Sequence, residues 1–198
     1  NVIYQLGEIY EKINIKETIK YFEILAKRNY PEVQLKLGKI YFDNGNLDEA
    51  FKYFELASNK NNFQAFYNLG IIYKEKDDIQ KSIEYLTKAA NNGIPEALHE
   101  LGIIYGTKKY DRYNLDMAIE YHSKAVKQNY SDSYFNLAMI YADNQNKHFD
   151  SKKALEYLNI SANKENNAKA QFILGLKYYF GEWVNKDVNE AIKYFLKS

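Results

Sequence analysis

The most regular feature of the chain is an apolar stripe that returns every 31 to 37 residues. Each stripe is centred on a leucine, with a small or β-branched residue four positions before it and a tyrosine four positions after it. Positions i−4, i and i+4 lie on one helical face, so each stripe predicts an amphipathic helix. The central leucines are Leu6, Leu37, Leu69, Leu101, Leu137 and Leu174.

Glycine follows the leucine in five of the six stripes, and alanine follows it in the other. Glycine inside a helix costs about 1 kcal/mol relative to alanine, so its recurrence at one position needs a reason. We expect a neighbouring helix to approach the backbone closely at this point.

A second pattern follows each stripe and predicts a second helix. It has a small residue, a tyrosine three positions later, and an Asn or Asp four positions earlier, where a side-chain oxygen caps the first turn. The segment from Ala65 to Ala90 shows the whole unit of helix, turn and helix. The predicted caps are Asn14, Asn46, Asp78, Asn114, Asp150 and Asp187.

The ends of the second helices are marked as well, because Asn and Gly tolerate the left-handed conformation that terminates a helix. The predicted stop residues are Asn29, Asn61, Gly93, Asn129 and Asn166. Pro31 and Pro95 share one position at the start of a first helix, where proline is favoured. These signals predict an all-α solenoid of about six helix-turn-helix repeats in a single domain, residues 1–198. The repeats cover approximately 1–30, 31–61, 62–94, 95–130, 131–166 and 167–198.

The last three repeats are longer than the first three, and the extra residues lie in the turn between the two helices. They are approximately residues 107–110, 145–148 and 182–185. We expect longer loops there, along one edge of the solenoid.

Composition and charge argue against some classes of function. The formal net charge is +1 and arginine occurs only at positions 28 and 112, which argues against nucleic-acid binding. No apolar run is long enough to span a membrane, so we predict no membrane insertion. Cysteine is absent, which slightly favours the cytoplasm over a secreted or periplasmic location. Because the chain begins at Asn1 and stops within a repeat, we expect a fragment of a longer protein, and its compartment stays open.

The sixth repeat, AQFILGLKYYFGEWVNKDVNEAIKYFLKS, resembles the Sel1-like repeat, a relative of the tetratricopeptide repeat. Glu190 stands where the family pattern has lysine, and repeats two and three resemble the tetratricopeptide repeat in their short turn. The resemblance covers essentially the whole chain. It implies a right-handed α/α superhelical solenoid that acts as a scaffold for other proteins. The matching positions are Ala170, Leu174, Gly175, Tyr178, Gly181, Val184, Asp187, Ala191 and Tyr194.

In the solenoids that this chain resembles, the first helices line the concave face. The positions two before and two after the central leucine are almost wholly apolar in the third to sixth repeats. We therefore expect a groove that binds an apolar or helical peptide segment of a partner protein. The alternative is that these side chains pack between neighbouring first helices, with Phe135 the first candidate for the core. The predicted partner-binding residues are Tyr67, Ile71, His99, Ile103, Phe135, Met139, Phe172, Leu176 and Tyr179.

No arrangement of residues indicates an enzyme. The three histidines, His99, His122 and His148, lie at different positions of the repeat, so we expect packed or solvated side chains rather than metal ligands. Glycine-rich nucleotide-binding motifs are absent. We predict no catalytic residue, no metal and no cofactor.

Two classes of function follow. The first is a non-catalytic scaffold for protein–protein interaction. The alternative is a regulatory or substrate-recruiting arm of a larger enzyme whose catalytic domain lies outside these residues. The last helix carries apolar Ile192, Tyr194 and Phe195 without a following repeat. A terminal repeat needs a polar outer face, so we expect either a continuation of the chain or self-association through this end.

Overall fold

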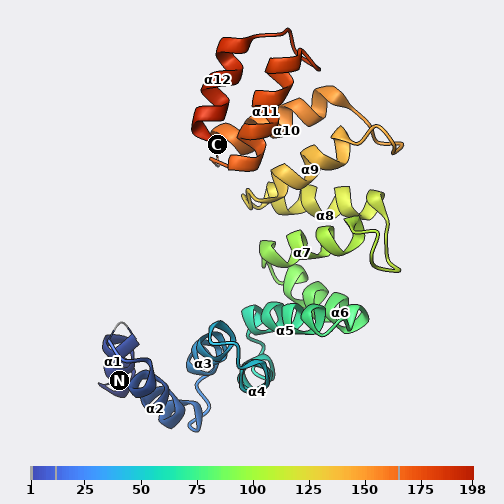
Figure 1. Cartoon of the computed structure of the whole chain (residues 1–198). Helices are drawn as coiled ribbons and strands as arrows, with labels where there is room; N and C mark the ends of the chain where they lie inside the picture. The colour runs from blue at the N-terminus through green and yellow to red at the C-terminus, as the bar shows by residue number, and fades with distance from the viewer. Residues whose placement is uncertain (1, 12, 165) are drawn as a thin grey trace. The chain divides into compact units, whose positions relative to one another are not determined.

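The structure is a computed structural model and describes every residue except 1, 12 and 165. The described residues form twelve helices and no strand (Figure 1), which confirms the predicted all-α fold of six helix-turn-helix repeats. The helices are α1 (Val2–Glu11), α2 (Ile15–Ala26), α3 (Pro31–Asp43), α4 (Leu47–Ser58), α5 (Phe63–Glu75), α6 (Ile79–Asn91), α7 (Pro95–Gly106), α8 (Leu115–Lys127), α9 (Ser133–Ala142), α10 (Ser151–Lys164), α11 (Ala168–Phe180) and α12 (Val188–Lys197).

The chain divides into two compact units, residues 1–97 and 98–198. The first unit contains α1 to α6 and the beginning of α7, and the second contains the rest of α7 and α8 to α12. Within each unit, the two helices of a repeat pack on each other. The second helix also packs on the first helix of the next repeat. In the first unit, for example, Phe22 and Leu25 of α2 share a buried cluster with Leu37 of α3. That all six repeats form one continuous solenoid stays a prediction.

The predicted caps are confirmed. All six Asn and Asp side chains accept a hydrogen bond from a backbone N–H in the first turn of a second helix, as Asn46 does from Glu49 at 3.3 Å. The predicted stop residues have positive φ angles, 63° at Asn29 and 83° at Gly93. Asn62 and Asn167 cap the first helices α5 and α11 in the same way, which the repeat pattern did not single out. Local chemistry therefore sets where the helices begin and end.

The recurrent tyrosines of each repeat stack on one another. The ring centroids of Tyr41 and Tyr53 lie 5.6 Å apart with an interplanar angle of 2°, and the other five pairs lie 5.2–5.8 Å apart. Each pair joins the first helix of a repeat to its second helix. Burial raises the pKa of both Tyr41 and Tyr53 to about 12, with Glu23 adding to the shift. Both phenols are therefore neutral around pH 7.

The glycine after the central leucine receives a large side chain from the second helix. At Gly38, an added Cβ would lie 2.5 Å from two ring atoms of Phe54, whose side chain is fully buried. The same relation joins Gly7 to Phe22 and Gly175 to Phe195. The expected close approach is confirmed, and it explains why the helices tolerate glycine here.

We predict that Gly38→Ala lowers the free energy of unfolding. The clash with Phe54 costs about 1–3 kcal/mol, more than the gain of about 1 kcal/mol in helix propensity. Gly106→Ala is the control, because a Cβ there meets only Ala118 Cβ at an ordinary 3.5 Å. Chemical denaturation followed by circular dichroism measures both variants. Equal stability of Gly38→Ala and the unmodified chain would contradict the close-contact explanation.

Candidate functional site

The most exposed aromatic side chains of the second unit gather on α11. Phe172, Tyr179 and Phe180 are all exposed, and Phe172 retains 51% of its accessible surface. Met139 of α9 is exposed as well. Their sequence explains the exposure, because they lie off the face that carries the central leucine, which is buried in both α9 and α11. These side chains remain available to a partner.

Two hollows lie along α9 and α11. One has a volume of about 480 Å³ and is lined by Phe135, Phe172 and Ile173 among others. The other, of about 380 Å³, is lined by Met139, Leu176, Phe180 and Trp183 among others. Phe135 is only partly buried, and its ring borders the first hollow. We call the side chains of Phe135, Met139, Phe172, Leu176, Tyr179 and Phe180 the α9–α11 surface.

A charged corner borders the α9–α11 surface at the end of α11. Lys177 Nζ lies 2.7 Å from Glu182 Oε2 and 3.9 Å from the ring centroid of Trp183. Trp183 has a φ of 65°, a left-handed conformation that is unusual for a bulky residue. The ion pair and the cation–π contact hold this turn against the helix. They place the indole at the edge of the 380 Å³ hollow.

The predicted partner-binding residues outside the α9–α11 surface have other surroundings. Ile103 lines a third hollow of about 310 Å³, which Met139 of the α9–α11 surface also borders. Tyr67 and Ile71 lie on α5 in the first unit, where both are partly buried. Their share in a common surface stays a prediction.

His99 differs from the other predicted residues, because only 8% of its surface is exposed. Its Nδ1 lies 2.8 Å from Ser133 Oγ, and Nδ1 of the equally buried His122 lies 3.2 Å from the same oxygen. The two imidazole centroids are 5.3 Å apart. His99 therefore belongs to a buried polar cluster, and we leave it out of the α9–α11 surface.

His99 and His122 occupy different positions of the repeat, so the repeat pattern alone predicts no contact between them. The two positions nevertheless meet in other repeats. The rings of Tyr4 and Phe22 are 5.9 Å apart, and those of Phe172 and Phe195 are 5.7 Å apart, at the equivalent places. Comparison of the same pair of positions across all repeats would have revealed the cluster.

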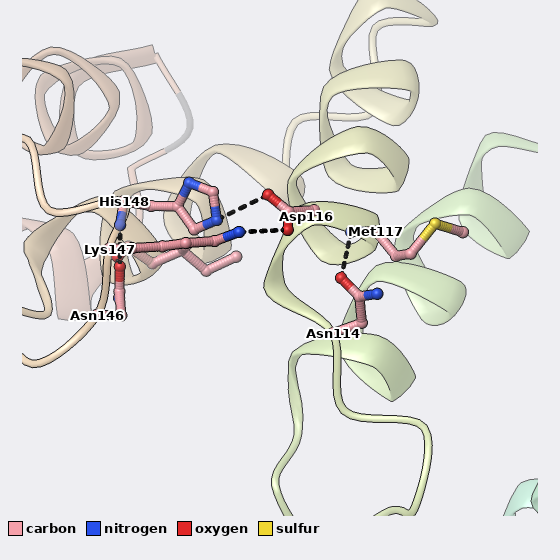
Figure 2. Close-up of polar contacts among 7 residues, drawn as sticks. Asn114, Asp116, Met117, Asn146, Lys147 and His148 are labelled. Carbon is pink, nitrogen blue, oxygen red and sulfur yellow. Dashed lines mark hydrogen bonds and ion pairs between the residues drawn. The ribbon is translucent and has the colours of Figure 1, made fainter.

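A second polar cluster joins a long turn to α8 (Figure 2). Lys147 Nζ and His148 Nε2 lie 2.7 and 2.9 Å from the two carboxylate oxygens of Asp116. The turn is also ordered by Asn146, which donates to the Ile140 carbonyl and accepts from the His148 backbone N–H. The hydrogen bond from Lys147 is the main reason that the pKa of Asp116 is lowered.

The described residues contain no group of three or more His, Cys, Asp or Glu side chains placed to hold a metal ion. None of the helices in the described ranges has the length and apolar character to cross a bilayer.

Six helix pairs with capped second helices and stacked tyrosines define the class of tetratricopeptide-like α-solenoid repeats. The family model for the Sel1 repeat matches residues 2–30, 95–130, 131–166 and 168–198, and that for the tetratricopeptide repeat matches 31–59 and 63–91. The chain therefore belongs to the Sel1 repeat family. Such repeats generally form non-catalytic scaffolds for protein interaction.

Solved structures of low sequence identity share the fold of this chain. A protective antigen of uropathogenic Escherichia coli with an SLR fold is 23% identical, with a TM-score of 0.84 over 98% of this chain and 44% of that one. A Sel1 repeat protein from Oxalobacter formigenes is 24% identical, with a TM-score of 0.83 over 98% and 82%. The APC/C hetero-tetramer Cut9–Hcn1 is 18% identical, with a TM-score of 0.69 over 98% of this chain and 38% of that one. The comparison with curated proteins returned no match.

We predict that Asp116→Asn loosens the turn over residues 143–149. Loss of the carboxylate removes the ion-pair partner of Lys147 and the oxygen that lies 2.9 Å from His148 Nε2, so amide hydrogen exchange in this turn becomes several-fold faster. In the unmodified chain, the pKa of Asp116 is lowered, so its contribution is present above the unfolded value near 4 and disappears as pH falls through the folded value.

Asp111→Asn, a change at an exposed position in the preceding long turn, is the control and should leave residues 143–149 unchanged. Exchange measured by mass spectrometry at pH 7 compares the two variants. Equal protection of the turn in both would show that Asp116 does not hold it.

Proposed function

We propose that the chain is a protein-interaction scaffold whose α9–α11 surface binds an apolar peptide or helical segment of a partner. The observation that carries the proposal is the exposure of Met139, Phe172 and Phe180 beside two hollows on neighbouring first helices. Exposed aromatic side chains next to hollows are typical of binding hot spots, where a few residues supply most of the affinity.

The dimensions suit a short helix or extended segment. Two hollows of about 380 and 480 Å³ have room for two or more large apolar side chains. An amphipathic helix presents such anchors at positions i and i+3 or i+4. Lys177 is largely covered and already paired with Glu182, so apolar contact rather than charge dominates the proposed recognition.

Membership of the Sel1 repeat family supports a scaffold, and one similar structure is itself a hetero-tetramer of Cut9 and Hcn1. These likenesses concern the fold, and the occupant of the α9–α11 surface is our inference from the exposed side chains. The chain spans 44% and 38% of two of its structural relatives. A role as the recruiting arm of a larger enzyme would use the same surface.

We predict that peptides selected on the intact chain from a random 16-residue library carry paired apolar or aromatic anchors. Phe172→Ala combined with Met139→Ala should weaken their binding by about 30-fold, the effect of losing a hot spot of about 2 kcal/mol. Isothermal titration calorimetry measures the dissociation constants, and circular dichroism checks that helicity is retained.

Phe149→Ala is the matched control, since Phe149 is 45% exposed in the same unit but outside the α9–α11 surface. It should leave peptide affinity unchanged. Binding that survives the Phe172/Met139 change, or that depends on Phe149, would place the site elsewhere on the chain.

We also propose that α12 takes part in self-association. Val188, Ile192 and Leu196 are exposed on it. The residues equivalent to Ile192 in earlier repeats, such as Ile19 and Phe51, pack against buried clusters that include the first helix of the next repeat. The exposed face of α12 thus has the apolar character of a repeat-to-repeat interface.

We predict that the sedimentation coefficient of this chain rises with concentration and that Ile192→Lys with Leu196→Lys abolishes the rise. The two lysines add charge to the apolar face without entering the core. Analytical ultracentrifugation tests both samples. A concentration-independent monomer before any substitution would contradict self-association.

A further inference from the structure

One junction between repeats has a polar interior where the equivalent positions are apolar. His122 occupies the place of Phe54 and Leu86, which pack on the glycine after the central leucine, and here its ring lies against Gly102. His99 takes the place held by Tyr67 and Phe135 in the neighbouring repeats. Ser133, the first residue of α9, replaces a small apolar residue. Three polar residues thus fill one apolar site at the contact of α7, α8 and α9.

The hydroxyl of Ser133 is a hydrogen-bond partner of both imidazoles. Ser133 Oγ is fully buried and lies within hydrogen-bond distance of Nδ1 of His99 and of His122. A hydroxyl donates one proton, so it donates to one Nδ1 while the other Nδ1–H donates to it. In this arrangement the imidazole that accepts at Nδ1 is neutral, with its proton on Nε2, and the other imidazole carries a proton on Nδ1.

Protonation upsets this arrangement. A proton added to the accepting Nδ1 leaves two N–H groups facing one hydroxyl, and it places positive charge in a buried site beside the second imidazole. The Ser133 hydroxyl proton then has to turn to another acceptor, and the positive charge has to reach water. Opening of the junction satisfies both requirements.

Other titratable groups lie near the pair. The Tyr130 ring, from the segment between α8 and α9, lies 5.1 Å from the His99 ring. Lys108 and Asp143 line the 310 Å³ hollow that His122 also borders, and both are exposed. Asp143 accepts a hydrogen bond from the Gln145 backbone. The hollow offers a route by which water reaches His122.

We propose that His99, His122 and Ser133 form an acid-sensitive latch, in which protonation of the imidazoles releases the beginning of α9 from α7 and α8. Because α9 carries Phe135 and Met139, release also alters the α9–α11 surface, a consequence that rests on the proposed function. The latch itself is independent of any partner. It would tie the binding state of this scaffold to the acidity of its surroundings.

The pKa of His122 determines in which direction, and over which pH range, the stability of the closed latch changes. Burial, with a smaller effect of His99, lowers the pKa of His122 to about 3 in the folded state. The ordinary value near 6.5 applies once the junction opens, so the open state binds the extra proton between these values. The closed latch is therefore stable above about pH 6.5 and weakens as pH falls below it. One such histidine raises the opening equilibrium constant about 25-fold between pH 7 and pH 5.

The test is amide hydrogen exchange of the whole chain from pH 7 to pH 5, corrected for the intrinsic exchange rate. Residues 1–97 contain no histidine and provide an internal reference. We expect opening of the α9 amides to increase about 25-fold or more relative to that reference. A change that matches the reference would overturn the proposal.

Variants assign the effect to the cluster. His99→Phe, His122→Leu and Ser133→Ala together copy the trio Phe135, Leu158 and Ala170 at the next junction, and this triple variant should lose the acid response. His148→Gln, which changes the remaining histidine on its turn, should keep it. Retention of the response by the triple variant, or its loss in His148→Gln, would overturn the latch.

A measurement on the unmodified chain covers the case in which the triple variant does not fold. Nuclear magnetic resonance follows the three imidazole Cε1–H signals as pH falls. We expect the His122 signal to remain that of a neutral ring until α9 opens. Ordinary titration of all three rings near pH 6.5 with the helices intact would overturn the proposal. Neither experiment involves a bound peptide, so failure of the latch is separable from failure of the α9–α11 surface.

Discussion

The close contact between the two helices of a repeat is the constraint on which the rest of the structure depends. A Cβ at Gly38 or Gly175 would lie about 2.5 Å from the ring of Phe54 or Phe195. The large side chain therefore fits only because the glycine leaves room, and the stacked tyrosines one turn away join the same two helices. Capping by Asn and Asp then fixes where the second helix begins, so each repeat has little freedom to pack differently.

This packing divides the repeat positions into those that hold the helices together and those whose side chains can contact a partner. From the second repeat onward, the central leucine and the small residue four positions before it are buried, because they pack within and between repeats. Met139 and Phe172, two after and two before the central leucine of their helices, remain exposed. The same separation makes the histidine cluster unusual, because His122 lies at a structural position. A polar residue there changes how one junction responds to its environment without changing the fold.

Much of the fold follows from local signals that the sequence displays. Asn46 and Asp78 as caps, Asn29 and Gly93 as stops, and the close approach at glycine are all as predicted. Contacts between positions of different helices were harder to predict, because periodicity within one helix does not say which side chains meet across two. The convergence of His99 and His122, and the contact of Lys147 with Asp116, depend on such pairings. The exposure of Phe180 depends on where α11 ends, a boundary set by the left-handed Gly181.

The central claim is that α9 and α11 present the binding surface of this scaffold. Hydrogen-exchange footprinting of the intact chain, with and without a selected peptide at saturating concentration, tests it most directly. At constant pH 7, where the histidine cluster is closed, we expect new protection in α9 and α11 and unchanged exchange in α1 to α6. Protection confined to α1 to α6, or to the second helices α10 and α12, would contradict the account.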